Sequence, residues 1–187
     1  MRGLHRYNYL GAALLSASLL AACGGGDGDD GAGGGTPPPP DGNGGGTVLT
    51  AGVPGLVGDW LENGCVATGF QSFKRLVRAA QLTTTSITYS EGVVMYGSAN
   101  CSGAGSQVGP SRLGEVVFSK SESNARVAAN WGQFTTITNT RSAAIWAKNS
   151  ETVLCLLGDQ TPSILPTLDA VEASLKTLPE LGCFTKR

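Results

Sequence analysis

The stretch Asn124-Ala125-Arg126-Val127-Ala128-Ala129-Asn130-Trp131 decides the fold class, because its side chains alternate with a period of two. Every second residue from Ala125 to Trp131 is apolar, whereas Asn124, Arg126 and Asn130 form the opposite face. Successive side chains of a β-strand point to opposite faces of the sheet, so this pattern predicts a half-buried strand.

The same period recurs on both sides of this stretch. Ile87 and Tyr89 alternate with Thr88 and Ser90, and Thr and β-branched residues suit strands. Further strands are predicted at 71–80, 93–97, 112–119, 134–139, 142–148 and 152–157, with a tight turn at 149–151. The chain is therefore expected to be mainly β, an antiparallel β-barrel or half-barrel, with a sandwich as the alternative.

One helix is expected near the C-terminus. An apolar face at helical spacing is formed by Leu168, Val171, Leu175 and Leu178. Thr167 is the predicted N-cap, and Pro179 is expected to end the helix. We expect the helix to pack on the outside of the sheet or to close one end of a barrel.

Composition excludes several classes of function. The 187 residues carry 13 Lys and Arg against 14 Asp and Glu, whereas a nucleic-acid binder of this size is usually clearly basic. The single histidine, His5, lies in the N-terminal segment, which removes Ser-His-Asp and Cys-His catalysis from the rest of the chain. We expect no metal, no cofactor and no nucleic-acid partner.

Residues 1–22 have the pattern of an export signal. Arg2 and Arg6 precede the apolar stretch Leu10 to Ala22, which is shorter than the roughly 20 residues that a membrane-spanning helix needs. The next segment, 23–47, is rich in Gly and contains Pro37 to Pro40. Such a composition predicts a disordered tether ahead of one folded domain at 48–187.

The end of the signal, Leu20-Ala21-Ala22-Cys23, resembles the lipobox of bacterial lipoproteins. The resemblance implies cleavage before Cys23 and attachment of acyl chains such as palmitate to it. Gly24, rather than Asp, follows the cysteine, which in that family implies sorting to the outer membrane. The protein is therefore expected in the bacterial cell envelope, anchored by these acyl chains. The alternative is a soluble exported protein that keeps Cys23 as a free thiol.

Four cysteines remain in the domain, Cys65, Cys101, Cys155 and Cys183. An even number in an exported chain predicts two disulfides, for which sequence alone allows three connectivities. We favour Cys65–Cys101 with Cys155–Cys183, because the second bond would join the segment after the helix to the preceding strand. The absence of any C-x-x-C spacing argues against a redox or metal role.

The motif Gly58-Asp59-Trp60 resembles the G-x-W signature of lipocalins and related calycin barrels. The resemblance implies that Trp60 packs across a closed barrel end, with a late arginine over it, for which Arg141 is the candidate. A second resemblance, to half-barrel ectodomains, rests on the spacings Trp60 to Cys65 and Tyr96 to Cys101. It supports the Cys65–Cys101 pairing.

A barrel of this size holds one small ligand or is filled by side chains. The candidate ligand-binding residues are Tyr89, Tyr96, Trp131 and Trp146, and the alternative is that they form the core. On the strand at 71–80, Lys74 and Arg78 share one face and Arg75 lies on the other, where they would meet an anion or simply solvate an edge.

Catalytic chemistry is hard to assemble from this sequence. Asp59 and Glu62 flank Trp60, but no pattern places both in one cleft as a glycosidase would need. No G-x-S-x-G or S-x-x-K motif activates a serine. We therefore expect no catalytic residues.

The sequence favours a lipid-anchored envelope protein that binds a small apolar or amphipathic molecule without catalysis. The alternative is a protein-interaction module, such as an envelope scaffold, an adhesin or an enzyme inhibitor, with residues 102–111 as a contact loop.

Overall fold

The computed structural model describes residues 47–158, 165–177 and 182–187. Its strands are β1 (Gly58–Glu62), β2 (Val66–Thr68), β3 (Gln71–Gln81), β4 (Ser86–Tyr96), β5 (Gly105–Ser123), β6 (Ala128–Thr136), β7 (Arg141–Ser150), β8 (Val153–Leu156) and β9 (Cys183–Lys186), and its helices are α1 (Val53–Leu56) and α2 (Leu168–Leu175). Within the described residues, no helix is long and apolar enough to cross a membrane.

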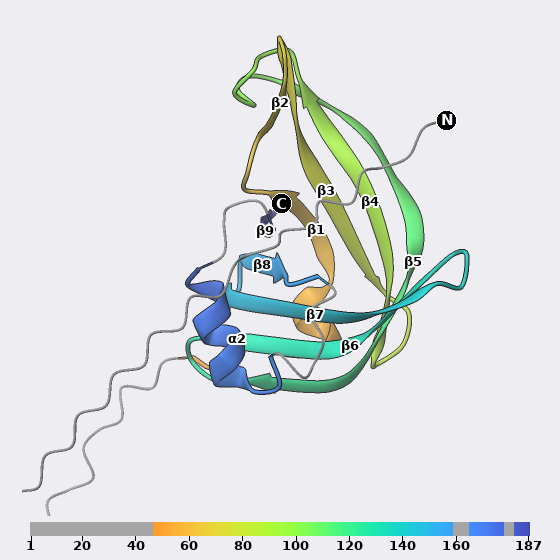
Figure 1. Ribbon diagram of the computed structural model, residues 1–187, viewed down its shortest axis with the longest axis vertical. Helices are drawn as coiled ribbons and strands as arrows, with labels where there is room; N and C mark the ends of the chain where they lie inside the picture. Colours follow the sequence, from red (N-terminus) through yellow and green to blue (C-terminus); the bar gives the residue numbers. More distant parts are fainter. Residues whose placement is uncertain (1–46, 159–164, 178–181) are drawn as a thin grey trace, which may run out of the picture. The chain divides into compact units, whose positions relative to one another are not determined.

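The sheet closes on itself because β1 pairs antiparallel with both β3 and β9. The remaining neighbours follow chain order from β3 to β9, so eight antiparallel strands form a closed barrel (Figure 1). β2 pairs with β3 as a short hairpin strand. The predicted fold class, a mainly β barrel with one helix near the C-terminus and two disulfides, is confirmed.

The strands bury apolar side chains on two separate faces. The inner face includes Trp60, Val77, Ile87, Val116, Phe118 and Phe184. The outer face of β6 and β7 is covered by α2, as Figure 1 shows, and buries Val127, Ala129, Trp131, Ile145 and Val171. β6 and β7 are therefore buried on both sides, and the helix takes the outer of its two predicted positions.

The start of α2 follows the predicted capping. The side-chain hydroxyl of Thr167 accepts a hydrogen bond from the backbone N–H of Ala170, which satisfies one of the free donors of the first turn. Asp169 lies in the same turn, where the helix dipole favours a negative charge. Leu178 and Pro179, predicted for the end of the helix, lie outside the described residues.

One end of the barrel is closed by α1 and Trp60. Trp60 is fully buried, and its Nε1 donates a hydrogen bond of 2.8 Å to the carbonyl of Leu56. The ammonium of Lys186 lies 5.2 Å from the centre of the indole. The expectation for Arg141 is wrong, because that residue is exposed at the start of β7, and a lysine of the last strand supplies the cation over Trp60.

Polar residues of the inner face tie the segment before α1 to this closed end. The side-chain oxygen of Asn130 accepts from the N–H of Gly52 at 2.6 Å. The buried ammonium of Lys148 donates to Glu151 at 2.6 Å, and the same carboxylate accepts from the N–H of Thr50. Asn130, expected on a solvated face, is fully buried because that face lines the barrel.

Both disulfides have the predicted partners. Cys65–Cys101 joins the segment between β1 and β2 to the turn between β4 and β5. Cys155–Cys183 joins directly facing residues of β8 and β9.

Several strand boundaries differ from the predicted ones. β4 and β6 each run unbroken where two strands were predicted, through Gly92 and Gly132. A Cβ at Gly132 would lie 2.2 Å from the carbonyl oxygen of Val117, and one at Gly92 would lie 2.5 Å from that of Val108. These glycines therefore allow β5 to approach closely and do not end a strand.

The remaining differences concern the strand ends. β5 begins at Gly105, so most of the predicted contact loop at 102–111 is strand. β7 continues to Ser150, which moves the turn to residues 151–152. The short strands β2 and β9 were not predicted, because three or four residues are too few to display a period.

Candidate functional site

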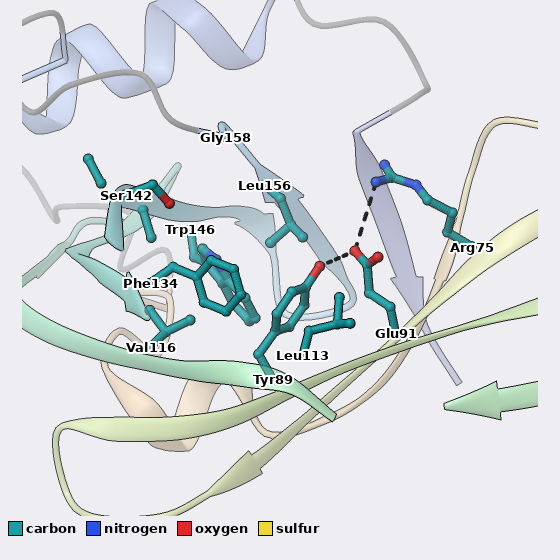
Figure 2. Close-up of a pocket in the computed structure, with 12 residues that line it drawn as sticks. Arg75, Tyr89, Glu91, Leu113, Val116, Phe134, Ser142, Trp146, Leu156 and Gly158 are labelled. Atoms are coloured by element: carbon teal, nitrogen blue, oxygen red, sulfur yellow. Dashed lines mark hydrogen bonds and ion pairs between the residues drawn. The ribbon is translucent and has the colours of Figure 1, made fainter. Parts of the chain in front are cut away.

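An open pocket of about 350 Å³ lies at the barrel end opposite α1. The course of β7 shows that the pocket and α1 lie at opposite ends of the barrel. Ser142, near the start of β7, lines the pocket, whereas Lys148, near its end, lies beside Gly55 of α1. Apolar side chains make up most of the wall, namely Leu113, Val116, Phe134, Ala144, Trp146 and Leu156 (Figure 2). The volume falls within the range of small-molecule sites, about 300–1,000 Å³.

The floor of the pocket is a set of aromatic rings from different strands. The ring of Tyr89 on β4 meets Phe134 on β6 edge to face at 5.4 Å between centroids, and Trp146 on β7 at 5.5 Å. Phe118 on β5 supports Trp146 at 6.0 Å. Edge-to-face contacts of this kind hold rings in fixed orientations, so the apolar wall is preformed.

A chain of polar groups forms one edge of the pocket. Nε and Nη2 of Arg75 donate to Oε1 of the buried Glu62, at 2.9 and 2.7 Å. Nη1 of Arg75 lies 4.0 Å from Oε1 of Glu91, and the hydroxyl of Tyr89 donates to that same oxygen. Figure 2 shows the Tyr89 hydroxyl and the Arg75 guanidinium converging on Glu91 at the border of the apolar wall.

The protonation states of this edge follow from burial and hydrogen bonding. Burial raises the pKa of Tyr89, and the neighbouring carboxylate of Glu91 raises it further, so the phenol stays a hydrogen-bond donor. Burial lowers the pKa of Arg75, but its hydrogen bonds to Glu62 and the negative charges of Glu62 and Glu91 together outweigh this and hold the pKa above its ordinary value. At neutral pH the edge therefore presents a fixed cation and a fixed phenol.

A second hollow, of about 430 Å³, adjoins the first across this polar edge. It shares Arg75, Glu91 and Leu113 with the first pocket and adds the apolar side chains of Phe73 and Val93. These two residues continue the inward-facing rows of β3 and β4, since Phe73 and Arg75 are two residues apart, as are Glu91 and Val93. The polar edge thus lies between two apolar hollows.

The structure brings together two of the four predicted ligand-binding residues. Tyr89 and Trp146 line the pocket. Trp131 lies on the outer face of β6, where its Nε1 donates to the carbonyl of Leu165 and Lys120 covers its ring at 4.3 Å. Tyr96 is the last residue of β4 and does not line either hollow. Trp131 does not line the pocket as predicted, because it lies on the outer face of β6, which α2 buries.

The sequence prediction missed Glu91, and it did not assign Arg75 to a pocket. The alternation along the strand did place Arg75 correctly on the face opposite Lys74 and Arg78, which lie on the outer face of β3. On that face Arg78 pairs with Asp59 at 2.6 Å, and the hydrogen bond from Arg78 lowers the pKa of Asp59.

The two carboxylates beside Trp60 do not form a catalytic pair. Asp59 binds Arg78 on the outside of β1, whereas Glu62 binds Arg75 on the inside and is only 2% exposed. No cluster of three or more His, Cys, Asp or Glu side chains that would suit a metal ion occurs in the described part of the chain.

Comparisons of the chain with protein-family models, with curated proteins and with solved structures find no match.

Proposed function

We propose that this chain is a lipid-anchored protein of the bacterial cell envelope, whose barrel binds one small amphipathic molecule without transforming it. The observation that carries the proposal is the open-end pocket, in which an aromatic wall meets a hydrogen-bonded edge of Arg75, Tyr89 and Glu91. An apolar body gains free energy by burial against the wall, and a polar group finds partners at the edge.

Two features support kinship with calycin barrels. Trp60 of the Gly58-Asp59-Trp60 motif lies at the closed end of a barrel, and a cation from the last strand, Lys186, lies over its ring. Ligand pockets occur preferentially in the mouths of β-barrels, which agrees with the position of the pocket.

Binding is tested by native mass spectrometry of the full chain, exported so that its disulfides form. We expect an additional mass that is lost on denaturation and recovered as a small amphipathic molecule. Ser142→Trp, which places an indole at the pocket wall, should abolish the additional mass. The control is Ser121→Trp, an exposed position on β5, which should retain it. An adduct that survives Ser142→Trp would place the ligand elsewhere.

The anchor is supported by the lipobox-like residues 20–23 and is tested separately. Because the thiol of Cys23 is the expected acyl acceptor, Cys23→Ala should abolish metabolic labelling with palmitate, while wild type is labelled. Membrane attachment needs more than one acyl chain, so the variant should also leave the membrane fraction. Continued labelling of Cys23→Ala would refute the lipoprotein assignment.

One observation favours the alternative of a protein-interaction module. Phe70, in the turn between β2 and β3, is 94% exposed, and burial of such a side chain against a partner stabilises a complex. If Phe70→Ser released a co-purifying envelope protein and Ser142→Trp did not, the interaction module would replace the binding protein as our proposal.

A further inference from the structure

The polar edge of the open-end pocket carries excess negative charge. One guanidinium, that of Arg75, faces the two carboxylates of Glu62 and Glu91, and the phenol of Tyr89 is uncharged. Among the described residues, Arg75 and Glu91 are the charged side chains that line this pocket and the adjoining hollow, and Glu62 lies buried behind Arg75. An anionic group placed at this edge therefore meets net repulsion, whereas an uncharged or cationic group does not.

The edge also has hydrogen-bonding groups to offer a ligand. Nη1 of Arg75 is 4.0 Å from Glu91, beyond hydrogen-bond distance, because Nε and Nη2 hold the guanidinium on Glu62. Glu91 uses Oε1 for Tyr89, and its Oε2 accepts no hydrogen bond from any described residue. A donor on Arg75 and an acceptor on Glu91 thus lie side by side, which suits an amide, while the acceptor alone suits an ammonium group.

Apolar surface lies on both sides of this edge. Trp146 and Phe134 line the first pocket, and Phe73 and Val93 line the adjoining hollow, with Arg75 and Glu91 common to both. A ligand that fills both hollows therefore carries its polar group in the middle and not at one end.

We propose that the pocket selects amphiphiles whose polar group is uncharged or cationic, donates a hydrogen bond to Glu91 and lies between two apolar arms. The carboxylate of Glu91 excludes anionic amphiphiles such as fatty acids. This inference rests on the proposed function and names the class of ligand for the same pocket.

The charge preference is tested with probes that differ in the polar group alone. The full chain is placed in phosphatidylcholine nanodiscs, and dihexylammonium, N-hexylhexanamide and dihexylacetate are titrated by calorimetry, with empty nanodiscs subtracted. We expect dihexylammonium to bind at least about tenfold more tightly than dihexylacetate, with the amide also ahead of the anion. Equal or tighter binding of dihexylacetate would overturn the inference.

The role of Glu91 is tested by Glu91→Gln, which keeps an oxygen for the Tyr89 hydroxyl and removes the charge. The gap between dihexylammonium and dihexylacetate should shrink about tenfold, mainly because the anion binds better. Glu115→Gln on the outward face of β5 is the matched control and should keep the gap. A gap that persists in Glu91→Gln would overturn the assignment to this residue.

The position of the polar group is tested with dodecylammonium, which has the same charge and a similar size but a single arm. We expect it to bind more weakly than dihexylammonium, by about threefold or more, because one hollow stays unfilled. Equal affinity would overturn the two-armed geometry.

Failure of the inference and failure of the proposed function give different results. If dihexylacetate binds wild type as well as dihexylammonium does, and Ser142→Trp abolishes binding, the pocket is a binding site but its charge preference is refuted. If no probe binds wild type above empty nanodiscs, both proposals are refuted.

Discussion

The two ends of the barrel are built from the same strands but use their inward polar groups differently. At the closed end, Asn130 and Glu151 bind backbone N–H groups of the segment before α1, and Trp60 donates to the last residue of that helix. At the open end, Arg75 and Glu91 mainly contact other side chains and border the two hollows.

The difference shows how a barrel of this size obtains both a core and a site. The segment before α1 and α1 itself cover one end, so side chains there are fully packed and their polar groups are tied to this segment. None of the described residues covers the other end in this way, and its aromatic rings support one another instead. Stability is therefore expected to depend mainly on the closed end, and binding on the open end.

The largest expected effect is at the closed end. Trp60→Ala should lower the free energy of unfolding by about 3–5 kcal/mol, because it leaves a cavity around a fully buried indole. Phe134→Ala at the open end should cost about 1–2 kcal/mol, since that ring is only partly buried. Urea unfolding of both variants with disulfides intact measures the difference, and equal losses would contradict it.

An intermediate effect is expected for the ion pair that fixes the segment before α1. Glu151→Gln should lower the free energy of unfolding by about 1–3 kcal/mol, because the buried ammonium of Lys148 loses its carboxylate. The control is Glu122→Gln, in which both partners of the pair with Lys120 are exposed, and a change below about 1 kcal/mol is expected.

The same pair predicts a pH dependence. The hydrogen bond from Lys148, together with that from the N–H of Thr50, lowers the pKa of Glu151 from 4.5 to about 2. A lowered pKa in the folded state means that the carboxylate stabilises the fold fully above pH 4.5 and less as the pH falls toward 2. Unfolding measured across this range should therefore be less pH-dependent in Glu151→Gln than in wild type.

The smallest effect on stability is expected at the open end. Tyr89→Phe removes the hydrogen bond to Glu91 but keeps the ring contacts with Phe134 and Trp146, so a loss of about 0.5–1.5 kcal/mol is expected. Tyr96→Phe, outside the pocket, is the control. If Tyr89→Phe destabilised the protein as much as Trp60→Ala does, the two ends would be equally important for folding.

The longer strands, the helix and the presence of two disulfides were predictable because each depends on local spacing or on the number of cysteines, whereas the cysteine count alone left three possible pairings. The alternation through Val127, Ala129 and Trp131 correctly grouped these side chains on one face. It did not reveal that this face packs against α2 and that Asn130 faces the barrel interior. Which face lines a barrel depends on a helix distant in sequence, so Trp131 could not be separated from Trp146 by pattern alone.

The polar residues of the interior escaped prediction for a related reason. Glu62, Arg75 and Lys148 are charged side chains that a local pattern assigns to solvent. The burial of Glu62 is stable because strand closure brings β1 beside β3, where Arg75 meets Glu62. Lys148 instead pairs with Glu151, three residues along the chain. The polar edge of the site is thus a product of long-range pairing.

The pairing of Cys155 with Cys183 also has a consequence for the behaviour of the chain before it is oxidised. The barrel is closed there by two strands of only four residues each, β8 and β9. If they separate from each other, β8 and β9 become free sheet edges, whose unpaired backbone groups can pair with another molecule. The covalent bond between the two short strands therefore protects the monomer against aggregation, and reduced chains should associate edge to edge where oxidised chains do not.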